Sequence, residues 1–220
     1  MKKFFIYAFT IASLITTTQV NAQKGFSLNV KATPQFSFLA NKDDNDNDNF
    51  KYKPTVNASF GIGAAYNFTR SVGVGVDVLY SLQGQRYKIN DTREYNQKNE
   101  YVKVPVYFSY NLNATKKFAL VGKLGPQLSF LTNSKLDDED GNKIIGDTKD
   151  RYQSATFGAM TSIGAQYKLN RNLYLTGAFR FDADFTNAED DQYPDYATGR
   201  AKTYNTTSGV ELGLKYAFAK

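Results

Sequence analysis

Side chains that could do acid–base chemistry are concentrated in one short segment near residue 180. Asp182 and Asp184 are two residues apart, which places both carboxyl groups on one face of a β-strand. Two neighbouring carboxyls could in principle share acid and base roles. Arg180 is on the same face, so ion pairing is the stronger interpretation. The chain has no histidine, the side chain that most often acts as a base. We therefore expect no catalytic residues and no enzyme.

A second group of carboxylates alternates along a polar stretch. Asp44, Asp46 and Asp48 have the spacing of the first ligands in a calcium-binding loop. The glycine of such a loop is replaced by Asn49, and its final glutamate position holds Thr55. Acidic runs of this kind are usually solvated loops. We expect no metal and no cofactor, with weak binding of surface calcium as the alternative.

The charged residues belong to segments in which apolar and polar side chains alternate. Near the C-terminus, Val210, Leu212 and Leu214 share one face, whereas Glu211 and Lys215 share the other. An alternation of period two indicates a β-strand. The segment is longer than the usual strand of a soluble sheet, and one face suits lipid while the other suits water.

Seven further segments repeat this pattern. Strands are expected at 26–38, 55–68, 72–83, 101–112, 118–131, 153–169, 173–185 and 204–218. Short turns and long polar loops alternate between them. The prediction is an all-β fold, an eight-stranded antiparallel up-and-down transmembrane β-barrel. A soluble barrel of the lipocalin type is the alternative, but it would have an apolar interior and a polar exterior, the reverse of this pattern.

Aromatic residues recur at both ends of the predicted outward faces, as expected where amphipathic rings meet a membrane interface. The belt at the end with short turns comprises Tyr66, Phe68, Tyr110, Tyr167, Tyr216 and Phe218, with Phe26 and Phe118 beside them. The opposite belt comprises Phe36, Tyr80, Phe130, Phe157, Phe181 and Tyr204.

Charged side chains of both signs occupy the predicted inward face. An eight-stranded barrel is only as wide as the side chains that fill it, so these groups are expected to pair. A packed polar plug is the main interpretation, and a narrow path for ions or protons is the alternative. The predicted lumen charge network is Lys31, Asp77, Lys103, Lys123, Arg180, Asp182, Asp184, Glu211 and Lys215.

The N-terminus has the pattern of a secretory signal peptide. A basic start is followed by an apolar run and by the small-residue sequence that ends at Ala22. The apolar run is shorter than a spanning helix needs, which disfavours the alternative of a membrane anchor. The predicted organisation is a signal peptide at 1–22 and one β-barrel domain at 23–220. The chain has no cysteine, so the strand ladder must hold the fold without disulfides.

Three short motifs resemble one family of outer-membrane barrels. They are EYVKVPVYFSY at 100–110, GKLGP at 122–126 and GAQYKL at 164–169. The first is similar to the YLEIPLLLKY strand of the Bacteroidetes outer-membrane β-barrel family that includes PorT-like proteins, small barrels of the OmpX and OmpA type. The resemblance implies a barrel, and it implies that some members serve secretion or gliding machinery. The aromatic last strand resembles an assembly signal, although Phe218 is followed by two further residues.

These observations lead to an expected location and role. The chain is expected in the outer membrane, with periplasmic termini and extracellular long loops. Expected partners are membrane lipid and lipopolysaccharide, the barrel assembly machinery and an envelope protein complex. Nucleic acid is not expected, because the basic residues are scattered. The expected function is a non-enzymatic structural or interaction platform, with a narrow porin-like channel or an adhesin acting through surface loops as alternatives.

Overall fold

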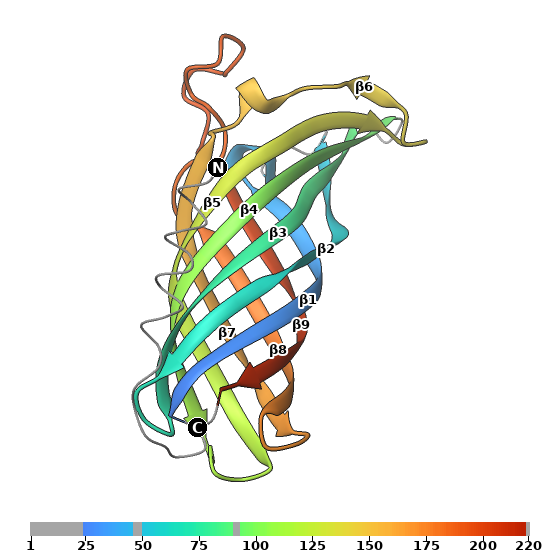
Figure 1. Ribbon diagram of the computed structural model, residues 1–220. Coiled ribbons are helices and arrows are strands. Elements are labelled where there is room, and N and C mark those ends of the chain that lie inside the picture. The colour runs from blue at the N-terminus through green and yellow to red at the C-terminus, as the bar shows by residue number, and fades with distance from the viewer. Residues whose placement is uncertain (1–23, 46–49, 90–92, 219–220) are drawn as a thin grey trace, which may run out of the picture.

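A computed structural model describes residues 24–45, 50–89 and 93–218 of the protein. The predicted signal peptide lies outside these residues. The described chain forms long tilted strands that wrap into a barrel (Figure 1). The elements are β1 (Gly25–Ala40), α2 (Lys42–Asn45), β2 (Phe50–Asn67), β3 (Val72–Ile89), β4 (Arg93–Leu112), β5 (Phe118–Asp138), β6 (Lys143–Ile145), the 3-10 helix η1 (Lys149–Arg151), β7 (Ala155–Lys168), β8 (Leu173–Asp184) and β9 (Tyr204–Ala217).

The barrel closes because its strands pair with both neighbours in antiparallel fashion. The sheet order is β4-β3-β2-β1-β9-β8-β7-β5-β6, and an additional pairing joins β4 to β5. The first and last strands are neighbours, with Ser27 opposite Ala217 and Ala40 opposite Tyr204. The short strand β6 pairs only with β5 and stands outside the ring. The predicted eight-stranded antiparallel barrel is therefore confirmed.

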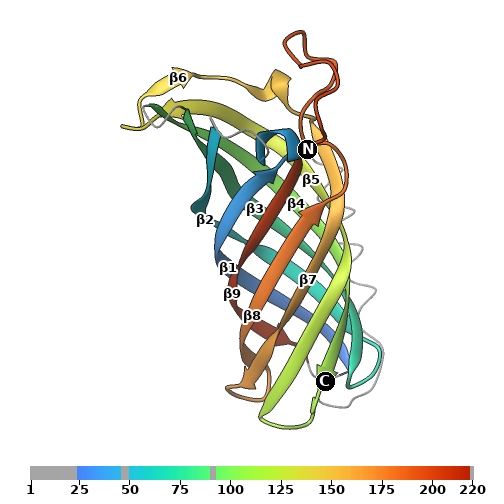
Figure 2. The same ribbon diagram turned by 180° about the vertical axis from the view of Figure 1, so that it is seen from behind.

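The two ends of the barrel differ in their connections (Figure 2). Three short turns, at 68–71, 113–117 and 169–172, lie at the end where β1 starts and β9 stops. Asn113 adopts a φ of 58° in one of these turns, a conformation that asparagine tolerates better than most residues. We call this the short-turn end. The opposite end carries α2, β6, η1 and the segment 185–203, and we call it the long-loop end.

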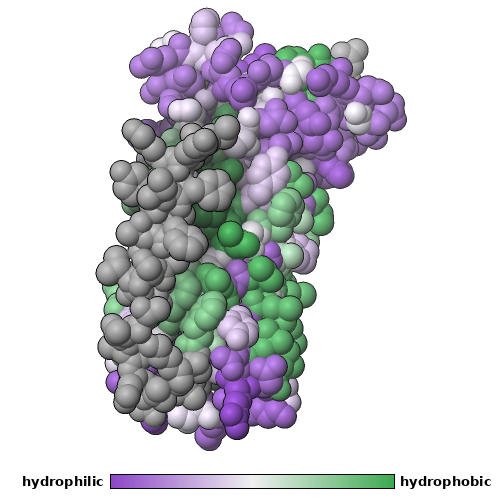
Figure 3. Space-filling view, viewed as in Figure 1, coloured by the Kyte–Doolittle hydropathy of each residue, from purple (hydrophilic) through white to green (hydrophobic). Residues whose placement is uncertain are grey.

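Alternation along each strand separates two kinds of surface. Apolar side chains point outward along the strands, and on the visible part of the face in Figure 3 they form an apolar band in the middle, with polar surface above and below it. Leu124, Ile163 and Phe179 are more than half exposed in this band. The predicted belt residues also point outward, with exposed fractions of Tyr66 43%, Phe68 52%, Tyr110 56%, Tyr167 40%, Tyr216 46% and Phe218 47%. None of the helices among the described residues is long and apolar enough to cross a membrane.

Four strands extend further toward the long-loop end than predicted. Segments expected to be loops instead continue β2 from Phe50, β3 to Ile89, β4 from Arg93 and β5 to Asp138. Their ends pair in register, as Arg86 does with Asn96, and form a sheet that leans away from the barrel axis (Figure 1). Beyond the apolar band both faces of this sheet carry polar residues, so hydrophobicity no longer alternates and the strand signal disappears from the sequence.

The apolar band predicts a strong penalty for a charge on its outer face. Replacing Leu124 by arginine should destabilise the barrel by about 2–4 kcal/mol in phospholipid vesicles, because the side chain is near the middle of the predicted membrane span. The measurement is urea unfolding followed by circular dichroism. Ile144→Arg on β6 is the control and should have little effect, since Ile144 is exposed outside the ring. Equal effects of the two substitutions would contradict a lipid-facing band.

Candidate functional sites: a sealed lumen and a cleft at the long-loop end

Arg180 of β8 is the centre of the lumen. Its side chain is 3% exposed, and its three nitrogen atoms all donate hydrogen bonds across the interior. Nε contacts Asp182 at 2.9 Å, Nη1 contacts Glu211 at 3.2 Å and Nη2 contacts Gln127 at 3.1 Å. One guanidinium therefore joins β8 to its neighbour β9 and, past β7, to β5.

Three lysines complete the network around this arginine. Lys103 donates to Asp182 at 3.0 Å, and Lys123 donates to Glu211 at 2.9 Å. Lys31 lies 2.6 Å from Asp77 and 3.5 Å from Glu211. These contacts form a continuous chain of ion pairs with Arg180 of β8 at its centre. The chain connects side chains from five other strands, β1, β3, β4, β5 and β9.

Glycines on the inner wall make room for this chain. A Cβ atom on Gly63 would lie 1.9 Å from Asp77 Oδ1, and one on Gly75 would lie 2.5 Å from Cζ of Tyr107. Tyr107 fills the space that Gly75 leaves and donates its hydroxyl to Asp77 at 3.2 Å. Lys31 Nζ and Lys123 Nζ lie 5.9 and 5.4 Å from the Tyr107 ring centroid, within cation–π range.

A second layer closes the lumen toward the long-loop end. Asp184 accepts hydrogen bonds from Thr156 at 2.6 Å and from Asn205 at 3.1 Å. Tyr101 and Met160 are completely buried beside them. Tyr101, Tyr107 and Met160 were not identified from the sequence as lumen residues. Their positions on the inward face of the strands could have predicted that they fill the lumen.

The structure places all nine residues of the predicted lumen charge network on the inward face. Lys31, Asp77, Lys103, Arg180, Asp182, Asp184 and Glu211 are buried, while Lys123 and Lys215 are partly buried. Lys215 stands apart, because its only polar contact among the described residues is with Gln166. Apart from Asp184, which is satisfied by neutral donors, the carboxylates each have a basic partner. Asp182 is bound by basic side chains and Asp184 by neutral hydrogen-bond donors, which argues against an acid–base role for either carboxylate.

A cleft of about 450 Å³ opens at the long-loop end. Four tyrosines and four carboxylates from distant parts of the chain meet there. Its lining is Asp44, Tyr87, Gln97, Leu136, Arg151, Tyr152, Glu189, Asp190, Tyr193, Asp195, Tyr196, Ala197 and Arg200. The tyrosine–proline–aspartate–tyrosine segment at 193–196 forms one wall, so the aromatic residues at this loop tip face a concave site.

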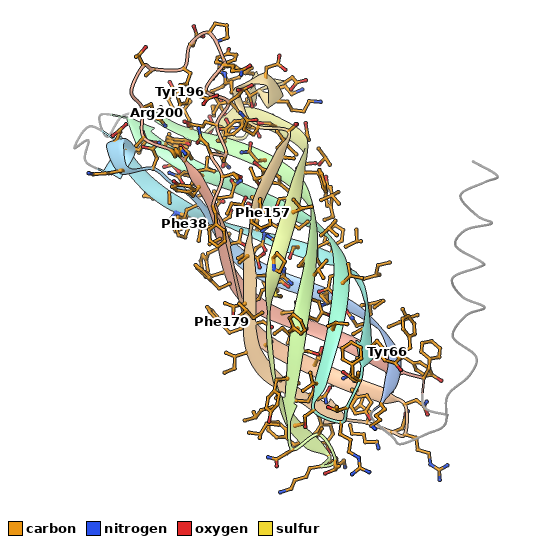
Figure 4. The ribbon with its side chains drawn as sticks, turned by 90° about the vertical axis from the view of Figure 1, so that its left-hand side faces the viewer. Phe38, Tyr66, Phe157, Phe179, Tyr196 and Arg200 are labelled. Atoms are coloured by element: carbon orange, nitrogen blue, oxygen red, sulfur yellow. The ribbon has the colours of Figure 1, made fainter. Side chains whose placement is uncertain are left out.

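Arg200 clamps the loops that form the cleft. It donates to Asp44 at 2.7 and 2.9 Å and to Glu189 at 2.7 and 3.0 Å. These hydrogen bonds, first those of Glu189 and then those of Asp44, raise the pKa of Arg200 above its ordinary value. Arg200 and Tyr196 lie close together on the same loop (Figure 4). The clamp joins α2 to the segment 185–203 across the mouth of the barrel.

Tyr152 forms the floor of the cleft. Burial raises the pKa of its phenol well above the ordinary value, so the side chain stays neutral. Its backbone forms an isolated bridge with Glu189. Next to it, the Arg151 guanidinium lies 5.7 Å from the Tyr193 ring centroid. Tyr152 thus separates the open cleft from the packed lumen beneath it.

The weak calcium candidates are not brought together as a described site. Asp46 and Asp48 lie outside the described residues, and both carboxylate oxygens of Asp44 bind Arg200. Within 24–45, 50–89 and 93–218, no group of three or more carboxylates is arranged to hold a metal ion.

Comparison with known proteins defines the class. The model of the family described as "Outer membrane protein beta-barrel domain" matches residues 18–189, and the chain belongs to this family. It is an outer-membrane β-barrel protein. The matched range stops before β9, the strand that completes the ring. No curated protein matches the chain in sequence.

Solved structures share the architecture at low sequence identity. The crystal structure of the outer membrane protein OprG from Pseudomonas aeruginosa is 15% identical with a TM-score of 0.52, and the alignment covers 90% of this chain and 98% of OprG. Neisserial surface protein A is 14% identical with a TM-score of 0.46, covering 88% and 97%. AlkL, solved in lipid bilayers, is 9% identical with a TM-score of 0.48, covering 93% and 95%. The likeness to OprG concerns the fold alone.

The ion-pair chain predicts a large loss of stability when its centre is removed. Arg180→Met should lower the free energy of unfolding by about 3–5 kcal/mol, because Asp182 and Glu211 each lose a buried partner. Urea unfolding in lipid vesicles measures the effect. Arg171→Met is the matched control, since Arg171 is exposed in a short turn. A loss below about 1 kcal/mol at Arg180, as for a surface ion pair, would show that the network is not tightly coupled.

Proposed function

We propose that the protein is a non-enzymatic, non-conducting platform in the outer membrane and that the cleft at the long-loop end is its contact surface. The observation that carries this proposal is the occluded lumen. Arg180 is tied to three side chains at once, and the fully buried Tyr101 and Met160 cover the next layer. Ions crossing the barrel would have to break this network.

The cleft supports the contact role by its shape and chemistry. Tyrosines are favoured at binding surfaces because they combine a large apolar ring with a polar hydroxyl and few rotatable bonds. Tyr193 and Tyr196 are neither buried nor fully exposed, and Asp195 lies between them. Because Arg200 holds the walls in place, little ordering would be needed when a partner binds.

The proposed orientation follows from the lengths of the connections. The short turns and both chain termini belong in the periplasm, and the long-loop end belongs outside the cell. The two aromatic belts would then mark the two interfaces, and lipopolysaccharide would surround the outer one. Within this orientation the cleft faces the environment of the cell.

The resemblance of segments 100–110, 122–126 and 164–169 to PorT-like proteins supports a more specific proposal. The barrel would work beside other envelope proteins, as part of a secretion, motility or uptake complex in a member of the Bacteroidetes. An adhesin acting through the same cleft is the alternative, and the two differ in whether the contact lies on the same cell or on another surface.

Planar-bilayer recording tests the occluded lumen. The purified barrel should show no discrete current steps in concentrated KCl, while an open porin in the same bilayers shows them. Steps of reproducible size that change with Glu211→Gln would contradict the proposal, because Glu211 is the carboxylate shared by Lys31, Lys123 and Arg180.

Site-specific photo-crosslinking in cells that naturally make the protein tests the cleft. A benzophenone side chain in place of Tyr196 should give a discrete crosslinked partner, whereas the same group in place of Phe179 should react only with lipid, since Phe179 points outward in the apolar band (Figure 4). A partner in the same envelope favours the complex, and one on a foreign surface favours the adhesin.

Two controls sharpen this experiment. The benzophenone at Asn142, an exposed turn residue next to β6, should not give the partner found at Tyr196. Arg200→Met should weaken the crosslink at Tyr196, because it releases the clamp to Asp44 and Glu189. The contact-surface proposal fails if positions 142 and 196 give the same products, or if neither gives any.

A further inference from the structure

The short-turn half of the lumen is hollow and carries an excess of positive charge. A cavity of about 50 Å³ lies on this side of Arg180, and a smaller one of about 20 Å³ follows it toward the opening. Both are lined by Lys215, Gln166 and Asn111, among others. The charged side chains around the two cavities are Lys24, Lys31, Arg70, Lys123, Lys215 and a single carboxylate, Glu211.

The carboxylate of Glu211 already forms ion pairs with basic side chains. Glu211 lies 2.9 Å from Lys123, 3.2 Å from Arg180 and 3.5 Å from Lys31. Lys215 has no acidic partner among the described residues. Its ammonium group donates to Gln166 and lies 4.8 Å from the centroid of the Tyr174 ring. A partly buried ammonium group without a counter-charge is unfavourable, and an anion in the cavity would relieve this.

Unused hydrogen-bonding groups line the same space. The Ser162 hydroxyl faces the larger cavity and the Tyr174 hydroxyl faces the smaller one. Both side chains are more than nine-tenths buried, and neither oxygen has a hydrogen-bond partner among the described residues. Asn29 Oδ1, an acceptor at the larger cavity, is also unpartnered. Buried polar groups normally find partners, so this set indicates an occupant.

We propose that this half of the lumen, the oxyanion cavity, binds a free small oxyanion with the size and charge of inorganic phosphate. Lys215 and Lys123 supply the positive charge, and the Ser162 hydroxyl donates a hydrogen bond, since all three side chains line the larger cavity. Hydrogen phosphate also carries an O–H group that Asn29 can accept. The volume holds a few waters or one such ion and excludes larger ligands.

The test is a phosphate titration of the detergent-folded barrel followed by ³¹P NMR, with chloride holding the ionic strength constant. Lys215→Met should weaken phosphate binding by about tenfold or more, the effect of losing one charge-assisted hydrogen bond. Ser162→Ala should weaken it by a smaller factor, because it removes a neutral hydrogen-bond donor. Lys116→Met removes the same charge from an exposed turn at the same end and should change the affinity by less than about twofold.

Stability gives a second readout that does not depend on the NMR signal. In chloride, Lys215→Met should unfold at the same urea concentration as the wild type or at a higher one, because a buried charge is removed. Phosphate should then raise the unfolding midpoint of the wild type and of Lys116→Met more than that of Lys215→Met. General salt effects cancel in this comparison because both proteins are measured in the same buffers.

Three outcomes would overturn the proposal. They are the absence of phosphate binding to the wild type, equal affinity of the wild type and Lys215→Met, and tighter binding of acetate than of phosphate. The last result would point to a carboxylate, such as the end of a peptide, as the occupant. None of these measurements depends on bilayer conductance or on the cleft, so the platform proposal stands or fails separately.

Discussion

The structure depends on the requirement that charges buried in a narrow barrel be paired. Withdrawing an ammonium or carboxylate group from water costs several kcal/mol, and only close partners with good geometry offset this. Arg180 meets the requirement by contacting Asp182, Glu211 and Gln127 at once. Other features follow from it. Gly63 and Gly75 are small so that Asp77 and Tyr107 fit, and side chains fill the middle of the lumen around Arg180.

The barrel itself was predictable because lipid and water impose opposite demands on alternate residues. That signal set the number of strands and the face on which each side chain lies. It failed for the extensions of β2 to β5, where Arg86 and Lys98 lie on one face and the buried residues of the other face, such as Gln97, are polar as well. Pairing there is maintained by the backbone ladder, and hydrogen bonds between main chains leave no pattern in the side chains.

The candidate sites were predictable only in part. The alternation of side chains along each strand placed Lys31, Lys123 and Glu211 in the interior. It did not indicate which of these side chains would form ion pairs with one another. Lys123 and Glu211 are 88 residues apart, and their contact depends on strand register around the closed ring. The clamp between Arg200 and Asp44 spans 156 residues and joins two polar loops whose sequences carry no periodicity. The cleft lined by Tyr193 and Tyr196 could not be predicted either, because it forms only when separate loops meet.

The position of Glu211 on the last strand has a consequence for the order of assembly. Lys123 on β5 relies on a carboxylate that the chain supplies only when β9 is in place, whereas Lys31 on the first strand also has Asp77 on β3. Among the described residues, Lys123 has no other acidic partner. An incomplete ring therefore leaves the ammonium group of Lys123 on its inner wall without a carboxylate partner. Insertion of β9 between β1 and β8 closes the hydrogen-bond ladder and supplies the carboxylate of Lys123 in the same step, so closure of the ring and completion of the ion-pair chain coincide.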